Sequence, residues 1–204
     1  MSTVLLGQQV AESQLLQAKL YIPRARPGLV PRPTLVDRLN QGARGKLTLI
    51  SAPAGFGKTT LLAEWLATAE VGRDRAAWVA LDQSDNEPTL FWAYFIAALQ
   101  TVYAQVGTRA LALLHSPQPL PVETLQGTLL NEISALPQPI VVVLDDYHLI
   151  GAQPVHQGIA FLLDHPGRIH RRGPRGATHA TRSRDLAAHR SRNAEPGNRR
   201  SAGD

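Results

Sequence analysis

The fold is decided by residues 46–60, which read Lys46-Leu47-Thr48-Leu49-Ile50-Ser51-Ala52-Pro53-Ala54-Gly55-Phe56-Gly57-Lys58-Thr59-Thr60. An apolar run comes first, a glycine-containing loop follows, and a helix-forming stretch begins at Leu61. This order predicts a strand over 46–51, a phosphate-binding loop and a helix over 59–69. Glycines let the backbone curl around a phosphate, and the N-terminus of the following helix offers its free N–H groups.

The loop predicts a site for ATP. The residues expected to line it are Ala54, Gly55, Phe56, Gly57, Lys58, Thr59 and Thr60. Lys58 would reach the β- and γ-phosphates as a catalytic residue, and the hydroxyl of Thr59 would coordinate Mg²⁺. Ala52 stands where the pattern G-x-x-x-x-G-K-[ST] has its first glycine. A Gly-Lys-Thr string also occurs on ordinary solvated loops. The loop alone therefore does not identify a nucleotide site, and a second matching segment, the one that holds the metal, is required.

That second segment is the run Ile140-Val141-Val142-Val143-Leu144, which ends in Asp145 and Asp146. A β-branched run of this length is typical of a buried parallel strand. Asp145 would hold the Mg²⁺, and Asp146 is the catalytic candidate that orients or deprotonates the attacking water. The alternative is that the two aspartates only begin a turn. His148 nearby is either an acid or base or a structural histidine.

Several further stretches carry a resemblance to a known family. They are Leu20-Tyr21-Ile22-Pro23, Arg26 to Pro33, Leu35-Val36-Asp37-Arg38-Leu39, Trp78-Val79-Ala80-Leu81-Asp82, Asp85-Asn86-Glu87-Pro88, Phe91-Trp92 and Val143 to Ile150. Together with the loop, they make residues 18–165 resemble the N-terminal ATPase domain of the LuxR-type, MalT-like transcriptional regulators, a branch of the signal-transduction P-loop ATPases. In that family alanine in place of the first loop glycine is ordinary.

The resemblance implies more about the site and the partners. The proline-rich segment 23–33 would close over the adenine, with Val30, Pro31 and Arg32 as contacts to base and phosphate; the alternative is a plain proline-rich lead-in. ATP and Mg²⁺ would be the cofactors, and the domain would self-associate with ATP. The sensor repeats and the helix-turn-helix of full-length relatives do not occur in this sequence, so specific DNA binding by this chain is not expected.

Composition narrows the class of protein. The 204 residues include no cysteine, which favours a reducing cytoplasm, and no apolar run approaches the length of a membrane span. The net charge of +5 is concentrated at the end of the chain, because residues 166–204 hold ten arginines against three acidic residues. The first 165 residues carry eleven Lys and Arg against thirteen Asp and Glu. The domain itself is therefore not basic.

The chain divides into a lead-in over 1–22, a partial P-loop NTPase domain over 23–165 and a basic tail over 166–204. Besides the strand and helix around the loop, we expect helices over 34–39, 89–102 and 122–136 and a strand over 76–81. Asp85 and Asn86 would cap the helix that begins at Thr89; the alternative is that they lie with Asp82 at the metal site. Strands that alternate with helices predict an α/β fold with a parallel sheet flanked by helices, incomplete at its C-terminal side.

The tail has few residues that could form a core. Its only aliphatic side chains larger than alanine are Ile169 and Leu186, so we expect disorder. Relatives continue here with an apolar strand ending in Ala-Thr-Arg. They then have a segment resembling x-Asp-Pro-x-x-Pro-Leu-Ala-Arg-Leu. Codons permitted for residues 173–186, read two bases later, can spell Ala-Thr-Arg followed by such a segment, which suggests a shifted reading frame. The alternative is a natural disordered basic tail.

Three functions follow. The first is an ATP-binding signalling switch domain of a LuxR-type regulator, at most a weak ATPase. The second is a free-standing P-loop ATPase that drives a partner protein. The third is nonspecific nucleic-acid binding by the arginines of the tail, which stand among Gly, Pro and Ala without aromatic residues for base stacking.

Overall fold

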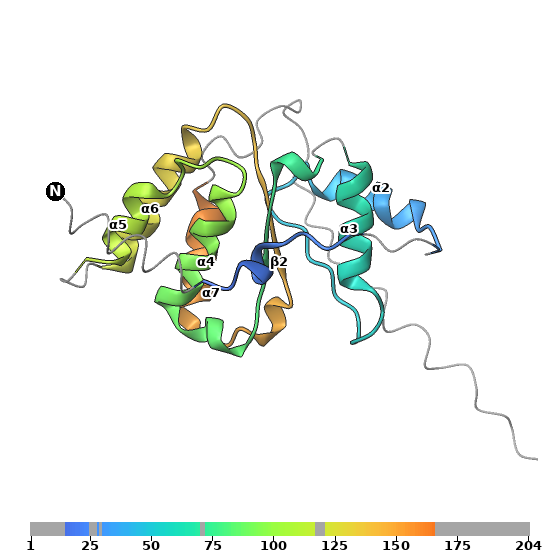
Figure 1. Ribbon diagram of the computed structural model, residues 1–204, viewed down its shortest axis with the longest axis horizontal. Coiled ribbons are helices and arrows are strands. Elements are labelled where there is room, and N and C mark those ends of the chain that lie inside the picture. Colours follow the sequence, from blue (N-terminus) through green and yellow to red (C-terminus); the bar gives the residue numbers. More distant parts are fainter. Residues whose placement is uncertain (1–14, 25–27, 29, 70–71, 117–120, 166–204) are drawn as a thin grey trace, which may run out of the picture. The chain divides into compact units, whose positions relative to one another are not determined.

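The computed structural model describes residues 15–24, 28, 30–69, 72–116 and 121–165. In the part of the chain so described, two parallel strands are flanked by helices on both faces (Figure 1). This is the α/β class with a parallel sheet that the sequence predicts. The predicted tail over 166–204 and most of the lead-in over 1–22 lie outside the described residues.

The sheet joins β1 (Ala76–Ala80) to β2 (Val141–Asp145), with Ala76 opposite Val141 and Ala80 opposite Asp145. Side chains alternate between the two faces of the sheet. Trp78 and Val143 point into a cluster around α3 (Lys58–Thr68), whereas Val79 belongs to a larger cluster around α4 (Pro88–Gln100). Both faces of the pair are therefore covered, as expected for parallel strands.

The α3 cluster is the smaller of the two hydrophobic cores. Its buried members are Leu39, Leu61, Trp65, Leu66, Ala76, Trp78 and Val143. Leu39 comes from α2 (Pro33–Gly42), which is longer than the predicted helix and lies against α3. Asn40 accepts a hydrogen bond from Nε1 of Trp65 at 2.8 Å. These contacts pack α2 and α3 against one face of the strand pair.

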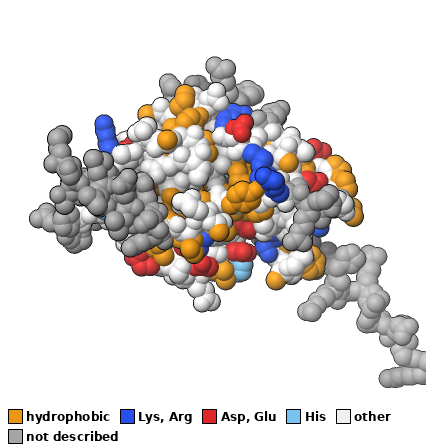
Figure 2. All heavy atoms as spheres, viewed as in Figure 1, with side chains coloured by type: hydrophobic (Ala, Val, Ile, Leu, Met, Phe, Trp, Pro, Cys, Tyr) orange, Lys and Arg blue, Asp and Glu red, His pale blue; other side chains and the backbone are white. Residues whose placement is uncertain are grey.

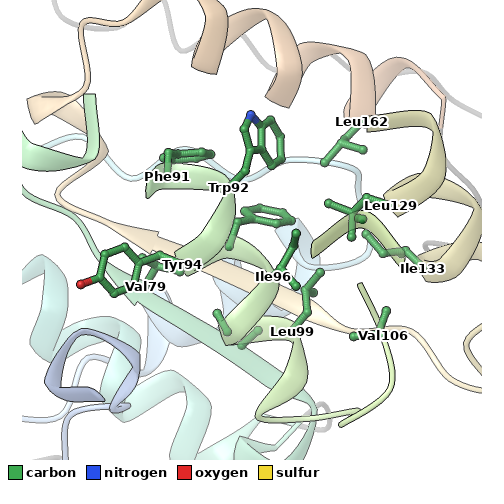
Figure 3. Close-up of a cluster of buried hydrophobic side chains, with 14 of the residues drawn as sticks. Val79, Phe91, Trp92, Tyr94, Ile96, Leu99, Val106, Leu129, Ile133 and Leu162 are labelled. Carbon is green, nitrogen blue, oxygen red and sulfur yellow. The ribbon is translucent and has the colours of Figure 1, made fainter. Parts of the chain in front are cut away.

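The α4 cluster forms the main core. Helix α4 is apolar almost all round, which is typical of a buried helix, and Phe91 lies edge-on to Trp92 with ring centroids 5.3 Å apart. Figure 3 shows these rings with Ile96, Leu129 and Leu162 around them. The last two come from α6 (Val122–Ser134) and α7 (Gln153–Asp164); α5 (Thr108–Leu114) packs against α4 and α6.

Short 3₁₀ turns complete the described elements. They are η1 (Gln17–Leu20), η2 (Arg73–Arg75), η3 (Gln83–Asn86) and η4 (Tyr147–Leu149). Within the described ranges, no helix combines the length and apolar character that crossing a bilayer requires.

The predicted strand over 46–51 is wrong. Residues 47–53 have no regular secondary structure, and no backbone hydrogen bond joins 47–50 to another described segment. Leu47 and Leu49 are 65% and 81% exposed. A strand needs a neighbour to satisfy its main-chain groups, and no described strand pairs with this segment. Its apolar sequence alone therefore does not make it a strand.

The predicted caps of the helix at Thr89 are also wrong. Glu87 caps α4, accepting from the N–H groups of Thr89 and Leu90 at 3.0 and 2.6 Å. Asp85 is buried elsewhere, and Asn86 joins η3 to the start of α7 by accepting from the N–H groups of residues 151 and 152 at 2.6 and 3.0 Å. Glutamate is an uncommon cap, so the sequence favours Asp85 and Asn86.

Candidate nucleotide-binding site

The loop before α3 depends on two glycines. Gly55 and Gly57 have φ angles of 80° and 73°, in the left-handed region that side chains with a Cβ rarely adopt. Gly57 immediately precedes α3, so the loop ends at the helix N-terminus. The first N–H groups of a helix have no partner within it and carry partial positive charge. The loop and helix therefore have the arrangement that binds a phosphate.

Lys58 lies back across this loop. Its Nζ donates to the carbonyl oxygens of Ala52 at 3.0 Å and Pro53 at 3.4 Å. The ammonium group is therefore held at the loop and not extended into solvent. Exchanging these two neutral acceptors for phosphate oxygens would give stronger, charge-assisted hydrogen bonds.

Thr59 and Asp145 meet, although they are 86 residues apart in the sequence. Thr59 Oγ1 donates to Asp145 Oδ2 at 2.7 Å, and Asp145 is buried at the end of β2. A hydroxyl and a carboxylate are hard oxygen donors of the kind Mg²⁺ prefers. Within the described ranges, no group of three or more His, Cys, Asp or Glu side chains gathers to hold a metal. The donor pair fits an ion whose other ligands are phosphate and water.

Asp146 follows in an unusual backbone conformation. Its φ of 56° lies in the left-handed region, the one non-glycine example among the described residues. Aspartate tolerates this conformation better than most residues. Its N–H donates to Asp145 Oδ1 at 3.1 Å, while its own side chain is 46% exposed beside His148, whose Nδ1 lies 3.7 Å from Asp146 Oδ1. Because His148 is exposed too, it is not a core histidine.

Arg32 reaches the loop from the proline-rich segment. Its Nη1 donates to the carbonyl oxygen of Phe56 at 3.1 Å, and its backbone N–H donates to Glu64 Oε1 on α3 at 3.2 Å. The predicted partner Val30 is 80% exposed. The structure therefore brings Arg32 to the phosphate loop and leaves Val30 open to solvent. Thr60 belongs to the first turn of α3.

Sequence reasoning missed a buried ion pair at the carboxyl end of β1. Lys19 Nζ lies 2.8 and 2.9 Å from the two oxygens of Asp85 and 2.9 Å from Asp82 Oδ2. The same ammonium lies 4.5 Å from the centre of the Tyr94 ring. Asp82 is adjacent to Leu81, whose N–H donates to the Asp145 carbonyl at 3.0 Å. The polar segment around Lys19 has no periodic pattern that points to this contact.

The contacts among Lys19, Asp82 and Asp85 shift the pKa values of Lys19 and Asp82. Burial by itself lowers the pKa of Lys19, but the hydrogen bonds and the charges of Asp85 and Asp82 outweigh it and raise the pKa above its usual value. Hydrogen bonds from Ser84 and Lys19 lower the pKa of Asp82 to about 2. Both groups therefore stay charged near neutral pH.

Comparison with known proteins agrees with this geometry. The family model described as "AAA ATPase domain" matches residues 33–174. The match covers the phosphate loop, both strands and the helices around them, so the chain belongs to the AAA ATPase domain family. Membership in this family implies that the domain binds a nucleotide.

The curated relatives are longer regulatory proteins. The chain is 38% identical over 151 residues to a protein named HTH-type transcriptional regulator MalT from Serratia proteamaculans (strain 568). Proteins of the same name from Cronobacter sakazakii (strain ATCC BAA-894) and Yersinia pestis (strain Pestoides F) are 34% and 36% identical. Each match covers 74% of this chain and 16% of the relative. The chain therefore corresponds to a small part of these regulators.

Proposed function

We propose that this domain is the ATP-binding switch of a MalT-like transcriptional regulator and binds ATP with Mg²⁺ at residues 54–60. The observation that carries the proposal is the hydrogen bond between Thr59 and Asp145. It joins the helix after the phosphate loop to the end of β2 through two oxygen donors. A chance Gly-Lys-Thr string on a surface loop has no reason to meet a buried aspartate from a distant strand.

Each residue has a distinct task in this proposal. The N–H groups of residues 54–60 and the Lys58 ammonium hold the phosphates, and Arg32 adds a second cation over the loop. Thr59 and Asp145 would hold Mg²⁺, which neutralises phosphate charge when bound. Asp146 orients the attacking water and accepts its proton. Val30 remains a proposed contact to the base.

Binding is tested by titrating ATP with Mg²⁺ into the full chain in a calorimeter. Lys58→Ala removes hydrogen bonds from a charged donor, so affinity falls by about 10- to 150-fold. Lys46→Ala is the matched control, because Lys46 is exposed shortly before the loop and should leave affinity unchanged. Equal ATP affinity for Lys58→Ala and the wild type would refute the site.

We infer that hydrolysis is slow. The resemblance implies a Thr-Arg pair at the end of a further strand; here no apolar run precedes Thr181-Arg182 in the sequence, and the pair lies outside the described residues. Phosphate release should therefore be slow in the wild type. Release of several phosphates per second that Asp146→Asn abolishes, and that the exposed control Asp74→Asn retains, would contradict this.

A free-standing ATPase that drives a partner is the alternative. A switch assembles with ATP and turns over slowly, whereas a motor-like ATPase turns over quickly without assembling. Light scattering after gel filtration, with and without ATP, separates the two. We also propose that the protein acts in the cytoplasm.

Specific DNA binding by this domain is not proposed. Residues 1–165 carry more acidic than basic side chains. On the face seen in Figure 2, Lys and Arg are interspersed with Asp and Glu and form no broad basic surface. A domain that neutralised several phosphates of DNA would need such a surface.

We further propose that residues 166–204 arise from a shifted reading frame. The support is that codons permitted for residues 173–186, read two bases later, can spell Ala-Thr-Arg-Gly-Asp-Pro-Arg-Asp-Pro-Leu-Ala-Arg-Leu, which matches the strand end and the following segment that the resemblance implies. Sequencing the gene tests this. The proposal fails if no alternative frame across codons 165–204 encodes an apolar strand ending in Thr-Arg.

A further inference from the structure

The loop that follows β2, residues 146–152, carries Asp146 and leads to α7. It begins at Asp146 in its left-handed conformation, passes through η4 and ends at Ala152, the residue before α7. Its start is tied to the sheet, because the Asp145 carbonyl accepts from the N–H of Leu81 at 3.0 Å. The position of the Asp146 carboxylate therefore depends on what holds the rest of this loop.

Asn86 holds the other end of the loop with its whole side-chain amide. Its Nδ2 donates to the Leu149 carbonyl at 2.9 Å, and its Oδ1 accepts from the N–H groups of residues 151 and 152 at 2.6 and 3.0 Å. The second hydrogen of Nδ2 goes to the Gln83 carbonyl at 3.0 Å. An asparagine amide has two donor hydrogens and two acceptor positions. All four are therefore used, and an aspartate here would set a carboxylate oxygen against two carbonyl oxygens.

Both ties come from one segment, residues 81–86, which follows β1. Within it, Asp85 is buried and accepts hydrogen bonds from Lys19 at both oxygens, so the segment is itself anchored. Asn86 does not serve as a helix cap, because a capping side chain accepts from the second or third residue of a helix, whereas its partners precede α7, which begins at Gln153. The loop is therefore held at both ends by an anchored segment.

We infer that Asn86 is a positioning residue for the candidate ATPase site: it fixes the loop that carries Asp146 and so sets the rate of hydrolysis without setting ATP affinity. This inference rests on the proposed function, in which Asp146 orients the attacking water. Asn86 is not a catalytic residue, because no group of its amide is left for substrate. Among the described residues, Lys58 and Thr59 form no hydrogen bond with Asn86 or with the loop. Affinity should therefore survive its loss.

The first measurement needs no nucleotide. Amide hydrogen exchange, followed by NMR on the full chain, reports how firmly the loop is held. Asn86→Ala removes the acceptor of residues 151 and 152, so their amides should exchange about 2- to 10-fold faster than in the wild type. The matched control is Asn131→Ala, because Asn131 is exposed on α6 and its side chain has no hydrogen-bond partner among the described residues. Unchanged exchange in Asn86→Ala overturns the proposal, whether or not the chain binds ATP.

The wild type provides the same decision if Asn86→Ala does not fold by circular dichroism. The amides of residues 151 and 152 should exchange more slowly than those of residues 47–49, which have no backbone hydrogen bond to another described segment. Equal exchange of the two groups overturns the proposal, because the side chain of Asn86 then does not hold the loop in solution.

The second measurement separates positioning from a general loss of structure. Single-turnover hydrolysis of ATP with Mg²⁺, with the full chain in excess, resolves slow rates, and titration calorimetry gives the affinity. Asn86→Ala should hydrolyse ATP about 10- to 100-fold more slowly than the wild type, with an affinity within about twofold. Asn131→Ala should match the wild type in both. In a chain that already carries Asp146→Asn, Asn86→Ala should cause no further loss of rate, because it acts through Asp146.

Two results of this measurement overturn the proposal. A loss of affinity as large as the loss of rate would show that Asn86 supports the whole domain. An equal loss of rate with and without Asp146→Asn would show that Asn86 does not act through Asp146. Failure of the proposed function is seen separately, as equal ATP affinity of the wild type and Lys58→Ala. That result removes the role in hydrolysis, while the exchange measurement still decides whether Asn86 holds the loop.

Discussion

The buried pair between Lys19 and Asp85 gives the sharpest prediction about stability. Asp85 is 0% exposed, and both of its oxygens receive hydrogen bonds from Lys19 Nζ; the second also accepts the N–H of Asp82 at 2.8 Å. Lys19→Met keeps much of the side-chain volume beside Tyr94 but removes the ammonium. The variant leaves a buried carboxylate with a single N–H donor.

The expected loss follows from that burial. Removing one partner of a buried ion pair costs about 3–5 kcal/mol, because the remaining charge stays desolvated. For a domain of this size, each kcal/mol lowers the melting temperature by about 2–4 °C. Lys19→Met should therefore lower the melting temperature by about 6–20 °C.

Urea denaturation followed by tryptophan fluorescence measures the effect, since Trp65, Trp78 and Trp92 are all buried. The control is Arg38→Met, which removes an exposed cation from α2 and should change stability by less than about 0.5 kcal/mol. Adding Asp85→Leu to Lys19→Met should recover most of the loss, because no charge is then left buried. A free energy of unfolding for Lys19→Met equal to that of the control would refute the reasoning.

Three further outcomes are expected. The lowered pKa of Asp82 stabilises the fold above pH 3.8, its unfolded value, and this stability is lost as the pH falls toward about 2. The raised pKa of Lys19 stabilises the fold below pH 10.5, and this stability is lost at higher pH. Urea denaturation across pH should show both losses, and an alkaline loss that persists unchanged in Lys19→Met would contradict the assignment to Lys19. Thr59→Val removes the hydroxyl proposed for Mg²⁺, so the ratio of ATP affinities with Mg²⁺ and with EDTA should approach one, whereas an unchanged ratio would exclude that role. Gly57→Ala forces a Cβ into the left-handed region beside Arg32 and should destabilise the protein by about 1–2 kcal/mol. The control Gly127→Ala, at an open position of α6, should stabilise the protein by up to about 1 kcal/mol in the same urea assay. Equal effects of the two substitutions would show that the loop does not require glycine at residue 57.

The elements that sequence predicts well are those with local signals. The predicted strands and helices around residues 76–81, 89–102, 122–136 and 140–144 correspond to β1, α4, α6 and β2 within three residues. Each has a long apolar or periodic pattern. The sequence also assigns Thr59 and Asp145 to one Mg²⁺ site, which stays a prediction, and the structure places their side-chain oxygens 2.7 Å apart.

The elements it misses depend on distant partners. Residues 46–51 have the composition of a strand but form none, because strand formation requires a neighbour that local sequence does not specify. Lys19 looks like a solvated residue of a polar lead-in, yet it reaches Asp85 across 66 positions. Asp85 has the local sequence of a helix cap, because its partner Lys19 is far away in the sequence. Long-range charge pairing leaves no mark in local composition.

The missing partner strand bears directly on the proposed nucleotide site. Residues 47–50 lead into the phosphate loop, and no main-chain ladder holds them to β2 among the described residues. The links that remain are the hydrogen bond between Thr59 and Asp145 and the shared packing of Ile50 and Val143 in the α3 cluster. A ligand that binds Thr59 and Asp145 together would therefore hold the loop against the end of β2, in a region that no main-chain ladder holds in place.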